Sequence, residues 1–247
     1  MMKISAHRGY SGLYPENTML AFQKAADARA DEIELDVHLS KDGQVIIFHD
    51  ESLERLTGQK GFVRDFAFDE LRKFNTSHIV YGDKFGFNPI PSLDEYLVWV
   101  KNSGIITNIE LKNNAYYYEG LEEKTIALIE KYNMTEQVYF SSFNHVSLVK
   151  CKNLNRAIPC GVLTNREIKN AGYHIKSNGF DFFHPEIKLL NNETAADCEK
   201  YDIGINAYTV NDMSGLLHAQ ACGCRGLITN YPDICKAWVN QNRENND

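Results

Sequence analysis

The 247-residue chain has no long hydrophobic run, since no stretch approaches the ~20 consecutive apolar residues that a membrane-spanning helix needs. It also has no dense block of lysine or arginine, and its 26 basic against 33 acidic residues give a formal charge of −7. Proteins that bind nucleic acid through its phosphates are usually basic. We therefore exclude a membrane span, and we exclude nucleic acid as the main partner.

The six cysteines lack the spacings of a metal or redox motif. None forms a C-x-x-C pair, and none has histidines nearby at zinc-finger spacing. We expect reduced, mostly buried thiols at these positions, which are Cys151, Cys160, Cys198, Cys222, Cys224 and Cys235. No secretory signal pattern precedes the first predicted strand. We therefore expect a cytoplasmic protein, or one that is already trimmed.

Short β-rich runs alternate with amphipathic helical patterns along the chain, and the alternation repeats eight times. The predicted strands are 3–7, 32–37, 105–111, 137–141, 159–163, 181–184, 204–210 and 226–229. The clearest predicted helices are 17–28, 92–101, 121–132 and 211–221. Eight such units closing on themselves make a (β/α)8 or TIM barrel, in which chemistry gathers at the carboxyl ends of the strands. The length suits one barrel domain over residues 1–247.

One segment, from about residue 51 to residue 91, breaks this rhythm. It is rich in glycine and proline and has only one short helical pattern, at 69–74, so it is too long for a plain βα loop. We interpret it as a small inserted cap, after the second strand region, at the mouth of the active site. Its phenylalanines favour a small core within the cap, with an apolar lipid-binding surface as the alternative; they are Phe62, Phe66, Phe68, Phe85 and Phe87.

Glu34 and Asp36 are the most informative residues, because alternation along an apolar strand sends both carboxylates to one face. Glu110 and Lys112 repeat this spacing on another strand. Buried like charges are costly unless a cation or a proton offsets them. Alone, each pair would more often be an exposed strand face or an ion pair. Together on separate barrel strands, three carboxylates favour an oxygen-only site for Mg²⁺ or Ca²⁺, with Mn²⁺ also accepted.

Two histidines lie at predicted strand ends beside these charges. His7 ends the first strand, and His49 follows a short strand predicted at 44–48. Histidine titrates near neutral pH, so a pair flanking a phosphorus centre can act as general base and general acid. Arg8 and Lys112 offer cations for phosphate oxygens. Among the other histidines, His184 remains a candidate for pocket lining.

Nine blocks, in order along nearly the whole chain, closely resemble the glycerophosphodiester phosphodiesterase family. They are Ala6-His7-Arg8-Gly9, Pro15-Glu16-Asn17-Thr18, Ile33-Glu34-Leu35-Asp36-Val37, Lys41-Asp42-Gly43, His49-Asp50, Ile109-Glu110-Leu111-Lys112, Ser141-Ser142-Phe143, Tyr208-Thr209-Val210-Asn211 and Ile228-Thr229-Asn230-Tyr231-Pro232. The resemblance implies a capped (β/α)8 barrel that uses a divalent cation to hydrolyse glycerophosphodiesters to an alcohol and glycerol 3-phosphate.

Carried over residue by residue, the resemblance assigns three kinds of role. It implies acid/base residues His7 and His49, metal ligands Glu34, Asp36 and Glu110, and phosphate contacts Arg8 and Lys112.

Four further positions complete the comparison with the family. Glu16 and Asn17 match a motif at the rim of the site, although Asn17 could equally cap a helix. The family commonly has tryptophan where this chain has Tyr208 and aspartate where it has Asn230, so the hydrophobic wall and the last strand end differ here.

Two alternatives remain open from the sequence. One is a phospholipase D-like or C-like barrel that acts on lysolipids or intact lipids with similar residues. The other is a non-catalytic relative that binds a phosphodiester or a protein, although the complete polar set argues against it. The alcohol headgroup, the choice of metal, the roles of the two histidines, a cyclic phosphate intermediate and the oligomeric state are not fixed by the sequence.

Overall fold

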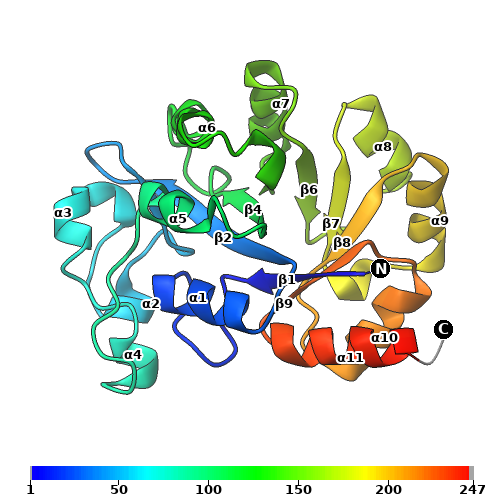
Figure 1. Cartoon of the computed structure of the whole chain (residues 1–247). Coiled ribbons are helices and arrows are strands. Elements are labelled where there is room, and N and C mark those ends of the chain that lie inside the picture. The colour runs from blue at the N-terminus through cyan, green and yellow to red at the C-terminus, as the bar shows by residue number, and fades with distance from the viewer. Residues whose placement is uncertain (1, 245–247) are drawn as a thin grey trace.

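The computed structural model describes residues 2–244 and shows a closed barrel (Figure 1). Neighbouring barrel strands pair in parallel, and β9 pairs back with β1, which closes the ring. The barrel strands are β1 (Lys3–His7), β2 (Glu32–Leu39), β4 (Ile106–Leu111), β5 (Val138–Ser142), β6 (Cys160–Thr164), β7 (Phe182–Pro185), β8 (Gly204–Ala207) and β9 (Gly226–Thr229). The predicted (β/α)8 barrel is confirmed.

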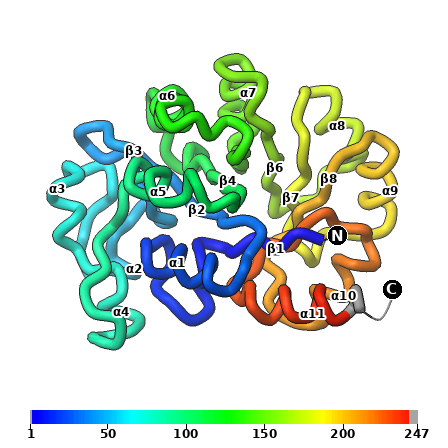
Figure 2. Tube along the Cα trace, in the orientation of Figure 1, coloured from blue at the N-terminus to red at the C-terminus, as the bar shows by residue number. Residues whose placement is uncertain are grey.

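Helices surround the barrel, and Figure 2 follows the Cα trace around this ring. They are α1 (Met19–Asp27), α5 (Leu93–Val100), α6 (Leu121–Lys131), α7 (His145–Leu154), α8 (Ala171–Ser177), α9 (Asn192–Lys200), α10 (Met213–Ala221) and α11 (Pro232–Glu244), with 3-10 turns η2 (Thr135–Gln137) and η3 (Ile187–Leu189). No helix between residues 2 and 244 combines the length and apolar character needed to cross a membrane. All six cysteines are free and buried, as predicted.

Strand β2 shows how the sequence divides the barrel into an outer apolar layer and an inner polar one. Ile33, Leu35 and Val37 are fully buried in the main hydrophobic core, which the surrounding helices share. The alternate residues, which include Glu34 and Asp36, are buried polar groups. Because side chains alternate across a strand, the apolar set packs against helices while the carboxylates face the barrel interior.

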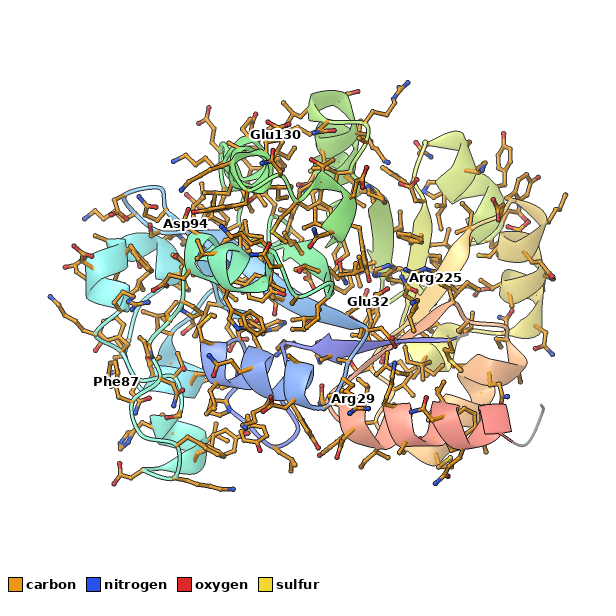
Figure 3. The ribbon with its side chains drawn as sticks, viewed as in Figure 1. Arg29, Glu32, Phe87, Asp94, Glu130 and Arg225 are labelled. Carbon is orange, nitrogen blue, oxygen red and sulfur yellow. The ribbon has the colours of Figure 1, made fainter. Side chains whose placement is uncertain are left out.

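The amino-terminal end of the barrel interior is closed by a polar network. Glu32 Oε1 accepts a hydrogen bond from Arg225 Nη2 at 2.8 Å, and Glu32 Oε2 accepts one from the Tyr139 hydroxyl at 2.7 Å. Arg225 Nη1 also donates to Asn206 Oδ1 at 2.9 Å. Figure 3 labels Glu32 and Arg225, which converge inside the ring of strands. The network joins β2, β5 and β8 to the residue that precedes β9.

Most predicted strands and helices begin or end one to three residues away from their bounds in the structure, and two of these differences have a clear local cause. The strand predicted at 204–210 ends at Ala207, because the chain then leaves the barrel ladder and Tyr208 forms a bridge with Glu186. The helix predicted to start at 17 begins at Met19, and its N-cap is Thr18, whose side chain accepts a hydrogen bond from the backbone N–H of Ala21. The interpretation of Asn17 as an N-cap is therefore wrong.

The inserted segment, residues 51–91, is called the cap below. It follows β3 (Val45–Ile47), which pairs antiparallel with β2, and it contains α2 (Glu54–Thr57), η1 (Val63–Asp65), α3 (Phe68–Leu71) and α4 (His78–Tyr81). Figure 1 shows these short helices on the side of the barrel toward which β1 runs.

The cap has a second hydrophobic core, which it shares with Ile46 of β3 and with Phe48. This second core includes the buried Leu53, Leu56 and Leu71, with Phe66 and Phe68 packed against it. That part of the phenylalanine prediction is confirmed. Phe62 and Phe87 differ, because their side chains are 44% and 60% exposed. The cap is thus a folded unit that leaves two aromatic rings in solvent.

Candidate active site at the carboxyl ends of the strands

The three carboxylates predicted from strand alternation come together. Parallel register places Asp36 of β2 opposite Glu110 of β4, and Glu34 lies one alternation earlier on β2. One oxygen from each of the three residues lies within 4.8 Å of the others, and all three residues are buried. Such a buried set of carboxylate oxygens fits a hard divalent cation.

Electrostatics point to the same fit. Burial, and next the charges of Asp36 and Glu110, hold the pKa of Glu34 well above its ordinary value. The pKa of Asp36 is lowered, since the attraction of His49, Lys112 and Arg8 outweighs the opposing effect of burial. Asp36 Oδ1 is buried without a hydrogen-bond partner among the described residues. A divalent cation would compensate the repulsion and engage this oxygen.

Two cationic side chains border the acidic cluster. The backbone N–H of Arg8 donates to Glu34 Oε2 at 2.8 Å, and its guanidinium lies 3.5 Å from Asp36 Oδ2. Lys112 Nζ donates to Glu110 Oε1 at 2.8 Å. Arg8 takes a left-handed conformation with φ 56° just after β1, which turns its backbone toward β2. These cations can hold phosphate oxygens beside the carboxylates.

The two histidines have partners of different charge. His7 Nδ1 lies 2.7 Å from Asn230 Oδ1; because that oxygen only accepts, Nδ1 carries the hydrogen and Nε2 keeps its lone pair. Burial, and next the positive charge of Arg8, lower the pKa of His7 to about 4, so its ring is neutral at neutral pH. His49 Nδ1 instead lies 2.5 Å from an oxygen of a carboxylate, Asp50 Oδ1.

One cavity of about 140 Å³ lies among these groups, although Asp36 and Lys112 are not among its lining residues. It is lined by His7, Arg8, Glu34, His49, Asn108, Glu110, Ser141, Phe143, Leu163, Tyr208, Thr209 and Ile228. A larger hollow of about 550 Å³ lies near the amino ends of β8 and β9, where Gly204 and Arg225 are among its lining residues. The smaller cavity is the better candidate active site, because it alone of the two is lined by two histidines and by two of the three clustered carboxylates, Glu34 and Glu110.

The remaining predicted residues occupy different positions. Tyr208 lines the cavity wall, and its ring meets that of Phe143 edge to face at 6.1 Å. Glu16 lies behind Arg8 and accepts from Arg8 Nη1 at 2.8 Å. Asn17 donates to Asp36 Oδ2 at 2.8 Å. Neither of these two is among the residues that line the cavity, and each contacts a predicted site residue instead.

His184 does not line the cavity, contrary to the sequence-based prediction. It is fully buried in the barrel, where its Nε2 lies 3.0 Å from Asn206 Nδ2. Burial, and next the charge of Arg225, lower its pKa to about 3, so the ring is neutral. It points inward from β7, but lies with the network that closes the amino-terminal end. Its position along the strand, rather than its face, explains the difference.

Several lining residues were missed by sequence reasoning. Asn108 and Ser141 are buried, and the polar atoms of both side chains have no hydrogen-bond partner among residues 2–244. Asn108 precedes Glu110 by two positions, so strand alternation could have placed it on the same face. Leu163 and Ile228 could not have been found in this way, because the sequence does not distinguish an apolar residue that faces a cavity from one in the core.

Comparisons with known proteins agree with this geometry. The sequence model of the glycerophosphoryl diester phosphodiesterase family matches residues 7–234. A glycerophosphodiester phosphodiesterase of Bacillus altitudinis is 39% identical over 236 residues, with 94% of this chain and 96% of that protein covered. One of Caldanaerobacter subterraneus subsp. tengcongensis is 35% identical over 230 residues, with 93% and 94% covered. The structure of an Oleispira antarctica phosphodiesterase with the product sn-glycerol-3-phosphate is similar at a TM-score of 0.86 and 28% identity, covering 96% of each chain.

Proposed function

Because this chain belongs to the glycerophosphoryl diester phosphodiesterase family, we propose that it hydrolyses glycerophosphodiesters to an alcohol and glycerol 3-phosphate by acid/base catalysis between two histidines. The chain is a glycerophosphodiester phosphodiesterase, and the finer assignment concerns its residues. One observation carries it: His7 and His49 line the same cavity as Glu34 and Glu110, and each histidine has a different partner.

His7 is assigned as the general base. Its Nδ1–H is held by Asn230, so the free Nε2 can accept the proton of the attacking oxygen. His49 is assigned as the general acid, since Asp50 stabilises its protonated ring. As the new phosphorus–oxygen bond forms and the old one breaks, the proton of the nucleophile passes to His7, and the proton of His49 passes to the departing alcohol oxygen.

Glu34, Asp36 and Glu110 would hold a divalent cation, with Mg²⁺, Ca²⁺ and Mn²⁺ as candidates. When bound, such a cation supplies positive charge to phosphate oxygens and to the nucleophile. Arg8 and Lys112 are assigned as contacts for phosphate oxygens, because both are cations beside the carboxylates. Arg8 lines the cavity, and Lys112 lies behind Glu110. Phe143 and Tyr208 exclude water from one wall of the cavity.

The nucleophile is either water or the glycerol 2-hydroxyl of the substrate. Attack by the hydroxyl forms a cyclic phosphate first, and attack by water does not. Phosphorus NMR of samples quenched early in the reaction distinguishes the two routes. A transient cyclic species supports the hydroxyl route, and its absence under every quench condition supports water.

The direct test uses protein stripped with EDTA and measures release of glycerol 3-phosphate from glycerophosphocholine and glycerophosphoethanolamine. We expect release only after Mg²⁺, Ca²⁺ or Mn²⁺ is added, and the rates identify the preferred cation and headgroup. Detergent-dispersed lysolipid is the parallel substrate, because Ile79, Val80 and Phe87 of the cap are exposed. Turnover of lysolipid alone would favour the lysolipid enzyme, and binding without turnover would favour the non-catalytic relative.

A further inference from the structure

We propose that Arg55, a residue of the cap, is a positioning residue that fixes His49 through Asp50 and Arg8 through Glu16. This inference rests on the proposed function, because it takes His49 and Arg8 as working parts of the site. It adds to that function a reason why the barrel carries a folded cap. Arg55 does not line the cavity, so it acts only through its two carboxylate partners.

The guanidinium of Arg55 binds two carboxylates at once. On one side, Nε lies 2.5 Å from Asp50 Oδ2 and Nη2 lies 3.0 Å from Asp50 Oδ1. On the other side, Nη1 lies 3.0 Å from Glu16 Oε2 and Nη2 lies 2.7 Å from Glu16 Oε1. Each pair is a two-point contact, which fixes the plane of the carboxylate as well as its distance. A lysine cannot reproduce this geometry, because it offers a single point charge.

Each of these carboxylates also contacts a residue that lines the cavity, and so fixes the position of that residue. Asp50 Oδ1 lies 2.5 Å from His49 Nδ1, and Glu16 Oε1 accepts from Arg8 Nη1 at 2.8 Å. The chain of contacts therefore runs from His49 through Asp50, Arg55 and Glu16 to Arg8. It joins the end of β3 to the loop before α1, which are far apart in the sequence. The proposed proton donor, His49, and the proposed phosphate ligand, Arg8, are thus held in fixed positions relative to each other.

The cap supplies the anchor for Arg55. Its helix α2 has only four residues, but Leu53 and Leu56 on either side of Arg55 are buried in the second core. The side chain of Arg55 is 45% exposed, whereas those of Glu16 and Asp50 are 18% and 24% exposed. Two-point contacts that form a network can stabilise a fold as well as orient side chains. The experiments below therefore separate the orientation of two cavity residues from a loss of folding.

Substitution of Arg55 tests this role directly. We expect Arg55→Ala to lower kcat about 10- to 100-fold, as is typical when the partner of a site residue is removed. Arg55→Lys should recover only part of the loss. Arg72→Ala is the matched control, since Arg72 is the other cap arginine in a close ion pair, at 2.7 Å from Glu95, and its side chain is 36% exposed. This control should keep normal kcat.

Guanidinium rescue separates positioning from cap misfolding. Because the side chain of Arg55 is partly open to solvent, guanidinium ions at millimolar concentration should enter the gap and restore several-fold activity to Arg55→Ala. They should not restore His49→Ala. Normal kcat in Arg55→Ala would overturn the proposal, and so would a loss that guanidinium leaves unchanged while circular dichroism and thermal melting remain as in the parent protein.

A leaving-group comparison tests the connection to His49. A p-nitrophenyl phosphodiester of glycerol releases a weakly basic alcohol that needs no proton. The fall in kcat of His49→Ala and of Arg55→Ala should therefore be smaller with this substrate than with glycerophosphocholine. The connection between Arg55 and His49 would be overturned if kcat of Arg55→Ala fell equally with both substrates while kcat of His49→Ala fell less with the p-nitrophenyl substrate. Normal turnover of glycerophosphocholine by His49→Ala would instead refute the proposed function, whatever Arg55→Ala does.

Discussion

His7 and His49 face one cavity, yet their Nδ1 atoms bind partners of different charge, Asn230 and Asp50. These neighbours support the two roles that we propose. Asn230 fixes a neutral tautomer of His7, whereas Asp50 places a carboxylate beside the ring of His49. Sequence reasoning identified both histidines from their strand-end positions. It could not assign their tasks, because Asn230 lies more than two hundred residues from His7 and becomes its neighbour only when the barrel closes.

Removal of either histidine should abolish most of the turnover. We expect His7→Ala and His49→Ala each to lower kcat by ~10² or more while the fold is kept, in line with acid/base contributions. Steady-state kinetics on glycerophosphocholine with the preferred cation gives the measurement. His174→Ala, at an exposed position on α8, serves as the control. Near-normal kcat in either cavity variant would remove that histidine from the chemistry.

Asn230→Asp should move the pH dependence of the enzyme. The pKa of His7 is lowered to about 4 by burial and by Arg8, and a carboxylate at Nδ1 would favour the charged ring and raise that pKa. A base with a higher pKa becomes protonated at a higher pH, so the acidic limb of kcat/KM should shift to higher pH. Rate profiles of both proteins test this. An unmoved limb would show that His7 does not set it.

At the scale of elements, strand β2 combines a structural face and a chemical face in one run of residues. Ile33, Leu35 and Val37 hold it in the main core, and this packing forces Glu34 and Asp36 into the barrel. Alternation alone predicted this arrangement correctly. The cap was predicted only as an interruption, because glycine and proline mark an irregular segment without telling how its pieces pack. Its second core and the position of Arg55 depend on contacts between distant residues.

The charge of Glu34 should destabilise the protein without metal. The pKa of Glu34 is higher in the folded than in the unfolded protein, where it lies near 4.5. Binding of a proton to this carboxyl group therefore favours the folded state, fully below pH 4.5, and this stability is lost as pH rises through the folded pKa. In EDTA, Glu34→Gln should therefore match the parent protein at acid pH and exceed its stability at pH 8, by about 1.4 kcal/mol for each pKa unit of the shift. Urea unfolding at both pH values measures this difference.

Metal addition gives the opposite result in the same pair of proteins. Mg²⁺ or Ca²⁺ should raise the melting temperature of the parent protein, because a ligand that binds only the folded state stabilises it. Glu34→Gln should lose most of this increase. Glu136→Gln, at an exposed position in η2, should retain it. An equal increase in all three proteins would place the cation outside the acidic cluster.

The stability of the cap should depend on the second hydrophobic core. Leu53 is fully buried there, so Leu53→Ala should cost ~2–5 kcal/mol of unfolding free energy through lost burial and a residual cavity. Kcat should fall as well, because Arg55, which we propose as a positioning residue, lies two residues further along the chain and would be displaced. Phe87→Ala, at a side chain that is 60% exposed, should stay within ~0.5 kcal/mol of the parent protein. Urea unfolding and steady-state kinetics of both variants provide the comparison.

In the molecule as a whole, closure of the barrel joins its first strand to its last. Strands β1 and β9 pair in parallel, and Glu32 meets Arg225 at the amino-terminal end of the interior. The eight βα units were predictable because each is a local pattern of periodicity. The pairing of the last strand with the first followed only from the count of units. The polar network below the cavity, which includes His184, could not be predicted from any local pattern.

Breaking this network should weaken the closed barrel. Arg225→Met leaves the carboxylate of Glu32, which is only 2% exposed, without its charged partner. Because Arg225 is itself partly exposed, we expect a loss at the lower end of the ~3–5 kcal/mol typical of a broken buried pair. The double variant Glu32→Gln with Arg225→Met should recover part of it. Lys24→Met, which removes an exposed ion pair with Asp27, should change unfolding free energy by less than ~1 kcal/mol.

Local sequence patterns were enough to predict the barrel, the acidic cluster, the two cavity histidines and the two cations, Arg8 and Lys112, that we propose as phosphate contacts. These follow from strand alternation and from residues at strand ends, which are local properties of the chain. No local pattern could show that Asn17 donates to Asp36, that His184 lies below the cavity or that Arg55 joins Asp50 to Glu16. Each of these contacts joins separate parts of the sequence, and it exists only once the barrel and the cap have packed.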